Sequence, residues 1–231
     1  MSELFNLDNG FFRFMGKIVD AVWVSVLWAV CCIPIVTAGA STTAFYYAVH
    51  KSIRHDEGYI TKDFFKAFKI NFIQSTICWL VLLALGVFLY VDARTTWNLL
   101  QAGDTVGNIF YLLLVLAVIY AMVVIYVFPY ISRFQDNNRT VIKNAFFLAL
   151  GNPLRTIVIL ISTVISAYVL YVIPYLIVIV PTLYMLAVEQ MMERNYKKFL
   201  PEEDSEEEDK ASVNGKQLGL FAGKKLKNNQ E

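Results

Sequence analysis

The chain has 231 residues, of which 57% are hydrophobic, 15% are aromatic and only 17% are charged. Soluble proteins have about 45–50% apolar and about 25% charged residues, so this composition excludes an ordinary water-soluble domain. The net charge of +1 divides into +4 for residues 1–200, with 15 basic against 11 acidic residues, and −3 for 201–231, with 5 against 8. Neither balance indicates nucleic-acid binding. We therefore expect an all-α, multipass membrane protein.

The N-terminus carries a short leader, residues 1–16, followed by the first long apolar run at 17–36. A hydrocarbon core of ~30 Å requires about 20 apolar residues in a helix, which this run supplies. A signal peptide has a shorter apolar region of roughly 7–15 residues. We therefore predict a retained span, preceded by a leader that lies in the cytoplasm.

The segment 37–55 is the most ambiguous part of the chain, because it is polar but follows Pro34 directly. If it is a cytoplasmic loop, the chain has five spans and the leader lies outside the cell. If it is a short returning helix capped by Thr37, the chain has six spans with both termini inside. We favour six spans and keep five as the alternative.

The distribution of basic residues decides between these topologies, because cytoplasmic loops are rich in Lys and Arg. Six spans place 14 basic residues near the spans on the inside and only Arg94 on the outside. Five spans would move Arg13 and Lys17 to the outside. In the six-span topology, the small and hydroxylated residues of 37–47 would let a short helix pack closely against its neighbours.

An amphipathic helix is predicted at 61–71, with Thr61 as its N-cap. Its aromatic residues recur at helical spacing and its lysines lie on another face, as in helices at an anionic membrane surface. It either anchors the next span at the membrane surface or docks a cytoplasmic partner. The candidate docking residues are Lys62, Phe65, Lys66 and Lys69.

Four further spans are predicted at 72–91, 109–131, 154–172 and 175–193. The last two come from one apolar run that is too long for a single crossing, and Pro174 is its natural break. We expect the loop 133–152 to be a second partner surface. The helix bundle would thus occupy 17–198, and the acidic and basic tail 199–231 should be disordered.

The sequence offers little catalytic chemistry. It has no P-loop, no dinucleotide-binding glycine pattern and no nucleophile elbow. His50 and His55 lack metal-ligand spacing for an α-helix. Glu189 is either a functional group within the last span or a residue at the level of the lipid head groups. The three cysteines Cys31, Cys32 and Cys78 lie in apolar runs. We therefore predict a non-enzymatic protein without a metal or another cofactor.

The string Pro-Ile-Val-Thr-Ala-Gly-Ala-Ser-Thr-Thr-Ala from Pro34, followed by Asp-Glu-Gly-Tyr at 56–59, resembles the YesL-like family of bacterial membrane proteins of unknown function. The resemblance covers about residues 5–195. It implies a protein of the bacterial plasma membrane, often encoded beside carbohydrate ABC transporters, and it assigns no catalytic residues. The candidate functional motif consists of Pro34, Thr37, Gly39, Ala40, Ser41 and Thr42.

Two functions follow from these observations. The first is an accessory or regulatory protein of carbohydrate uptake, with the lipid bilayer and components of a carbohydrate ABC transporter as its partners. The alternative is a small solute transporter, or a transporter subunit, with a polar site lined by residues 37–47.

Overall fold

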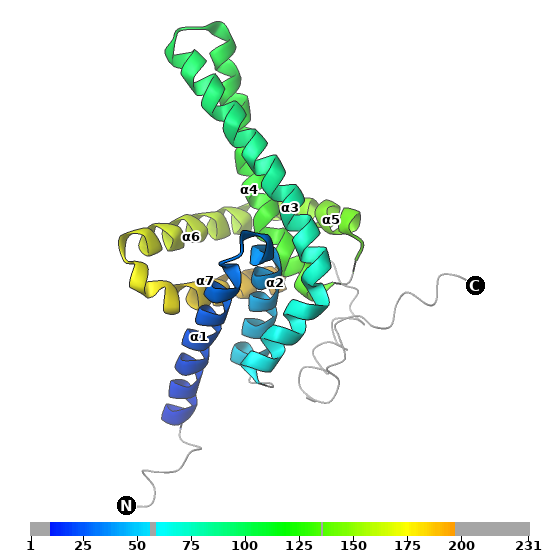
Figure 1. The fold of residues 1–231 in the computed structure, drawn as a ribbon, viewed down its shortest axis with the longest axis vertical. Coiled ribbons are helices and arrows are strands. Elements are labelled where there is room, and N and C mark those ends of the chain that lie inside the picture. The colour runs from blue at the N-terminus through cyan, green and yellow to red at the C-terminus, as the bar shows by residue number, and fades with distance from the viewer. Residues whose placement is uncertain (1–9, 56–58, 135, 197–231) are drawn as a thin grey trace, which may run out of the picture.

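A computed structural model describes residues 10–55, 59–134 and 136–196 of the chain. All regular elements in these ranges are helical, which confirms the predicted all-α class (Figure 1). The α-helices are α1 (Gly10–Cys32), α2 (Ala38–Ala48), α3 (Ile60–Gln101), α4 (Ile109–Arg133), α5 (Asn138–Gly151), α6 (Pro153–Val172) and α7 (Val180–Tyr196). Short helical segments connect some of them: η2 (Ile35–Thr37), η3 (Val49–Arg54), η4 (Thr105–Asn108) and η5 (Pro174–Val178).

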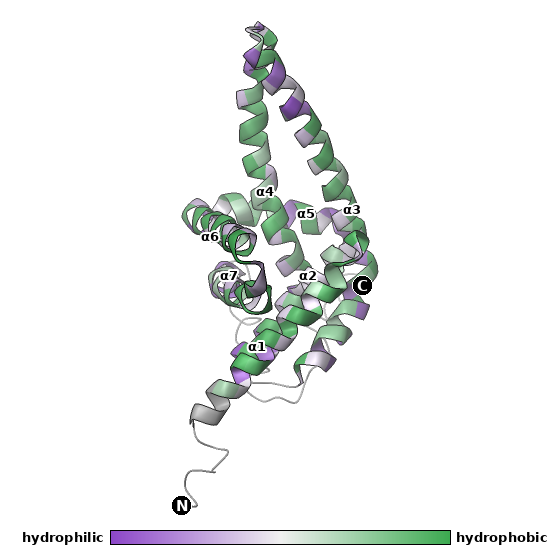
Figure 2. Cartoon of the chain, turned by 60° about the vertical axis from the view of Figure 1, so that its left-hand side comes forward, coloured by the Kyte–Doolittle hydropathy of each residue, from purple (hydrophilic) through white to green (hydrophobic). Residues whose placement is uncertain are grey.

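Four described segments are long and apolar enough to cross a bilayer: Met15–Cys32, Ile60–Gln101, Thr105–Arg133 and Pro153–Val172. Most of their side chains face away from the protein interior, and Figure 2 shows that hydrophobic residues predominate along α3 and α4. These segments contain or overlap four of the predicted spans. An integral membrane protein is therefore the class that this structure supports. The predicted leader 1–16 falls partly, and the predicted tail 199–231 wholly, outside the described residues.

Helix α2 forms the centre of the packed body, and nine of its 11 residues are buried. It turns back after α1 and lies beside α1 and α3 (Figure 1). Small residues allow this central position, because Gly39, Ala44 and Ala48 leave room for the neighbouring backbones. The segment 37–55 is thus helical rather than a loop.

Two predicted helix caps are wrong. Thr37 occupies the N-cap position of α2, but its hydroxyl donates to the carbonyl oxygens of Cys31 and Pro34 and does not cap the helix. Helix α3 begins at Ile60, one residue before the predicted cap Thr61, and its N-cap residue Tyr59 makes no side-chain cap bond. The Thr61 hydroxyl instead accepts a hydrogen bond of 2.8 Å from the indole nitrogen of Trp23.

Helix α3 joins the predicted amphipathic helix and the following span into one helix of 42 residues, about 63 Å long at a rise of 1.5 Å per residue. Its C-terminal half forms a hairpin with α4 that projects from the body (Figures 1 and 2). Gly86 permits close approach within this hairpin, because an added Cβ would lie 2.7 Å from the hydroxyl oxygen of Tyr120.

The break at Pro174 is confirmed, since α6 ends at Val172 and the short segment η5 leads into α7. The hairpin of α6 and α7 lies across the direction of the α3–α4 hairpin in both views (Figures 1 and 2). The predicted loop 133–152 is largely helical, because residues Asn138–Gly151 form α5. A hydrogen bond from the Asn138 backbone to the Asn137 side chain supports its first turn.

Candidate functional site

The predicted basic face at the start of α3 is exposed. The side chains of Lys62, Phe65, Lys66 and Lys69 all lie on the surface, and Phe65 is 41% exposed. The opposite face of the same turns is buried through Asp63, Phe64 and Ala67. The sequence therefore correctly placed Lys62, Lys66 and Lys69 on a different face from Phe64, although the buried face also contains Asp63.

A buried ion pair fixes the first turn of α3 to η3. The Lys51 ammonium donates a hydrogen bond of 2.6 Å to Asp63, and the side chains of these residues are only 10% and 6% exposed. The Ser52 hydroxyl donates to the second oxygen of the same carboxylate at 3.3 Å. Because buried charges need partners, this contact sets the position of the helix that presents the basic face.

A shallow pocket lies next to the basic face, between α1 and the start of α3. Its aromatic walls are Trp23 and Tyr59, which are 48% and 80% exposed, and Asp20 and Thr61 add polar groups. The pocket reaches α3 at Ile60 and Thr61, in the first turn, and the lysines follow over the first three turns of the same helix. Together they form a surface with both charge and apolar anchoring points, and we call this surface the α3 basic face.

The residues of the candidate motif have mainly packing contacts. Gly39, Ala40 and Ser41 are buried, Thr37 and Thr42 are half-buried, and Pro34 is exposed at the turn between α1 and α2. Gly39 faces α3 and α4 closely: a Cβ added to it would lie 2.6 Å from Trp79 Cβ, 2.7 Å from the Ser75 carbonyl oxygen and 2.9 Å from Phe128.

The hydroxyl groups of the 37–47 stripe form hydrogen bonds within the protein. Ser41 donates to the Trp28 carbonyl at 3.1 Å, and Thr42 donates to the Ala38 carbonyl while accepting from the Trp28 indole. Thr43 pairs with Ser75 on α3 at 2.9 Å. These bonds hold α2 between its neighbours, as small and hydroxylated residues do between membrane helices.

A second group of charged side chains lies buried where α7 meets the end of α2 and η3. Glu189 is fully buried. One of its carboxylate oxygens lies 2.8 Å from Nδ1 of His50, and the other lies 3.1 Å from Arg54 in an ion pair. The group therefore belongs to the protein interior.

Glu193, one turn further along α7, extends this charged group toward α4. Its carboxylate accepts a hydrogen bond of 2.9 Å from Arg133 and one of 3.1 Å from the Tyr46 hydroxyl. Two carboxylates and two guanidinium groups thus gather beside His50, from segments up to about 150 residues apart in the sequence. Charges at this depth are costly unless they are paired, and here they are paired.

Comparison with known proteins agrees with the family resemblance. The model of a family described as "Protein of unknown function, DUF624" matches residues 21–93, a range that includes both the candidate motif and the α3 basic face. The "Uncharacterized protein YesL" of Bacillus subtilis (strain 168) is 27% identical over 161 residues, which are 68% of this chain and 75% of that protein. No solved structure matches.

Proposed function

We propose that this chain, which belongs to the YesL-like family of proteins of unknown function, is an accessory or regulatory partner of carbohydrate uptake in the bacterial plasma membrane. Its α3 basic face would bind an acidic cytoplasmic segment of a carbohydrate ABC transporter. The observation that carries this proposal is the exposure of three lysines around Phe65 on a helix whose other side is buried.

The α3 basic face has the properties of a preorganised docking surface. The ion pair between Lys51 and Asp63 holds its helix in place, so a partner loses less entropy in binding than it would on a mobile loop. Lys62, Lys66 and Lys69 attract an acidic segment and orient it. Phe65 and the neighbouring Trp23 offer the exposed aromatic groups that often dominate binding energy.

An anionic membrane surface also attracts lysines, with about 1 kcal/mol per residue near the bilayer. The structure favours a protein partner, because the aromatic side chains Trp23 and Tyr59 surround a pocket with two polar groups beside the lysines. A lipid surface needs no such pocket. The partner class rests on the YesL-like resemblance, which implies carbohydrate transporters.

The first test replaces Lys62, Lys66 and Lys69 together by Gln and measures copurification from native membranes in mild detergent. We expect recovery of transporter components with the wild-type chain and at least about a tenfold loss with the triple Gln variant, because three favourable charge contacts disappear. Sugar uptake by the cells should fall in parallel.

Replacement of the same three lysines by Arg is the matched control, because it retains the charge at similar side-chain length. The triple Arg variant should recover the partner. Unchanged recovery and unchanged sugar uptake with the triple Gln variant would contradict the proposal. If only the binding of the purified chain to anionic vesicles falls, the lysines contact lipid and the proposal is also wrong.

We also propose the six-span topology, with both termini in the cytoplasm and with α2 and α7 as parts of the two short spans. The excess of basic residues on one side supports it, with 14 inside against Arg94 outside. The α6–α7 hairpin lies across the α3–α4 hairpin, and both cannot follow one membrane normal in that arrangement. If α6 and α7 cross the membrane as proposed, the angle between the two hairpins in the bilayer differs from that in Figures 1 and 2.

Labelling of single cysteines tests this topology in a chain whose three native cysteines are replaced by Ala. Thr105→Cys and Tyr175→Cys should react with an impermeant maleimide on intact cells, because both would lie outside. Lys62→Cys and Asn137→Cys should react only after permeabilisation. If Tyr175→Cys also requires permeabilisation, α6 and α7 do not cross the membrane as proposed.

A further inference from the structure

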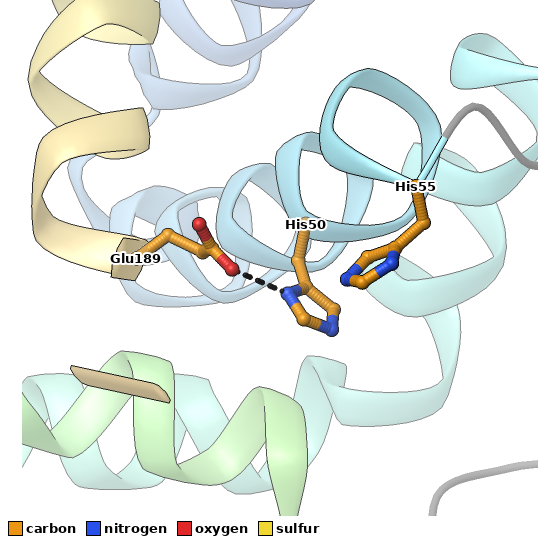
Figure 3. Close-up of side chains that lie close together, drawn as sticks. All are labelled: His50, His55 and Glu189. Carbon is orange, nitrogen blue, oxygen red and sulfur yellow. Dashed lines mark hydrogen bonds and ion pairs between the residues drawn. The ribbon is translucent and has the colours of Figure 1, made fainter. Parts of the chain in front are cut away.

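We propose that His50, His55 and Glu189 form a binding site for a divalent transition metal ion of the Zn²⁺ class. Figure 3 shows the two imidazole rings side by side, with the Glu189 carboxylate beside His50. The candidate ligand atoms of the three residues all lie within 4.8 Å of one another. This site does not depend on the proposed partner of the α3 basic face.

The π-helical segment η3 brings the two histidines together. His50 and His55 are five residues apart, a spacing that would direct them to different sides of an α-helix. The wider turn of a π-helix has i→i+5 hydrogen bonds and places such residues close together, and π-helical turns often occur at functional sites. The ring centroids of His50 and His55 lie 4.7 Å apart.

The donor set has the composition of a catalytic-type zinc site, in which two His and one Glu leave a fourth position open. A tetrahedral Zn²⁺ with bonds of about 2.0–2.1 Å places its ligand atoms about 3.4 Å apart. The 4.8 Å limit of the cluster must therefore shorten, while Nδ1 of His50 and the Glu189 oxygen, now 2.8 Å apart in a hydrogen bond, must give up that bond and separate slightly. His55 is exposed and can move to achieve this. Its exposure also gives the ion a path from solvent to the buried pair His50 and Glu189.

The second carboxylate of α7 completes the surroundings of the site. An oxygen of Glu193 lies 3.9 Å from Nδ1 of His50, close enough to approach a metal ion or to orient its bound water. Arg133 and Tyr46 hold Glu193 in place. The site therefore has both ligands and a group that supports them.

Arg54 competes with the metal ion for the carboxylate of Glu189. Its guanidinium lies 3.1 Å from the Glu189 oxygen that accepts no hydrogen bond, and it neutralises that carboxylate. The Arg54 side chain is 40% exposed, so it can turn into solvent when an ion binds. The proposal therefore predicts that removal of this guanidinium strengthens metal binding, whereas a purely structural ion pair predicts only a loss of stability.

The test uses the full chain in mild detergent, purified with a tag that contains no histidine and exposed to Zn²⁺ or Co²⁺. We expect about one Zn²⁺ per chain after dialysis, and with Co²⁺ the visible absorption of a tetrahedral ion. His55→Gln should weaken binding by more than about tenfold, because a direct ligand matters at least as much as the outer-shell groups whose loss costs 10–100-fold. Because His55 is exposed, we expect the His55→Gln variant to fold like the wild-type chain.

Arg54→Gln is the decisive companion variant. It should bind Zn²⁺ more tightly than the wild-type chain and show a larger increase in Tm when Zn²⁺ is added, because binding stabilises the folded state by mass action. Absence of stoichiometric metal from both the wild-type chain and Arg54→Gln would overturn the proposal. Binding that His55→Gln leaves unchanged would also overturn it, because the ion would then lie elsewhere on the chain.

Discussion

Replacement of Asp63 by Ala should lower the free energy of unfolding by about 3–5 kcal/mol. The substitution leaves the Lys51 ammonium in a buried position without its carboxylate partner, and an uncompensated buried charge has a cost of this size. The two charged atoms are 2.6 Å apart, and both side chains are largely shielded from solvent. The effect is measurable as a fall in Tm and in the midpoint of denaturant unfolding in detergent micelles.

The matched control for this prediction removes both charges together. The double variant Lys51→Met with Asp63→Leu should stay much closer to wild-type stability than Asp63→Ala alone, because apolar side chains of similar volume often replace a buried ion pair without loss. Because the pair positions α3, Asp63→Ala should also weaken partner recovery through the α3 basic face. If Asp63→Ala changes the free energy of unfolding by less than about 0.5 kcal/mol, the ion pair does not stabilise the fold as predicted.

The long apolar helices were predictable because their signals are local. A long apolar run must be a helix in a bilayer, where each backbone polar group needs a partner within its own segment. The break at Pro174 followed from the missing amide donor of proline. The basic and apolar faces at the start of α3 followed from the 3.6-residue period alone.

The contacts of the buried charges were not predictable, because they depend on helix packing over long sequence distances. Glu189 contacts His50, 139 residues away, and no periodicity in either segment relates them. The pairing of His50 and His55 depends on a π-helical turn, so α-helical spacing does not predict it. Asn152, between α5 and α6, and Pro153, the first residue of α6, were a local break signal that could have revealed α5 as a separate helix.

The central position of α2 was also not predictable from the sequence, although the small residues of this helix indicated close packing. A hydropathy window averages the hydropathy of consecutive residues, so it contains no information about neighbouring helices that surround a polar segment. The hydroxyl groups of Ser41 and Thr43 form hydrogen bonds with partners on α1 and α3. These bonds replace the hydrogen bonds to water that the hydroxyl groups lose when the segment is buried. The motif residue that depends most on this packing is Gly39.

Replacement of Gly39 by Ala should destabilise the protein by about 1–3 kcal/mol, and Gly39→Leu by more, because added atoms in a filled space force the helices apart. The added Cβ would lie 2.7 Å from a backbone oxygen of Ser75 and 2.6 Å from Trp79 Cβ, and neither is the flexible end of a side chain. Helix α2 would therefore have to move away from α3 as a unit. We expect a lower Tm in detergent and weaker resistance to proteolysis.

Gly16→Ala is the control that separates this crowding from the general effect of glycine on helices. Gly16 lies in α1 with nothing within 4 Å of an added Cβ, so Ala there should be neutral or should stabilise by up to about 1 kcal/mol through its higher helix propensity. A difference in sign between the two variants would show that Gly39 is needed because of the approach of α3. Equal effects would show that helix propensity alone governs both positions, and the close packing of α2 would then not explain the glycine of the motif.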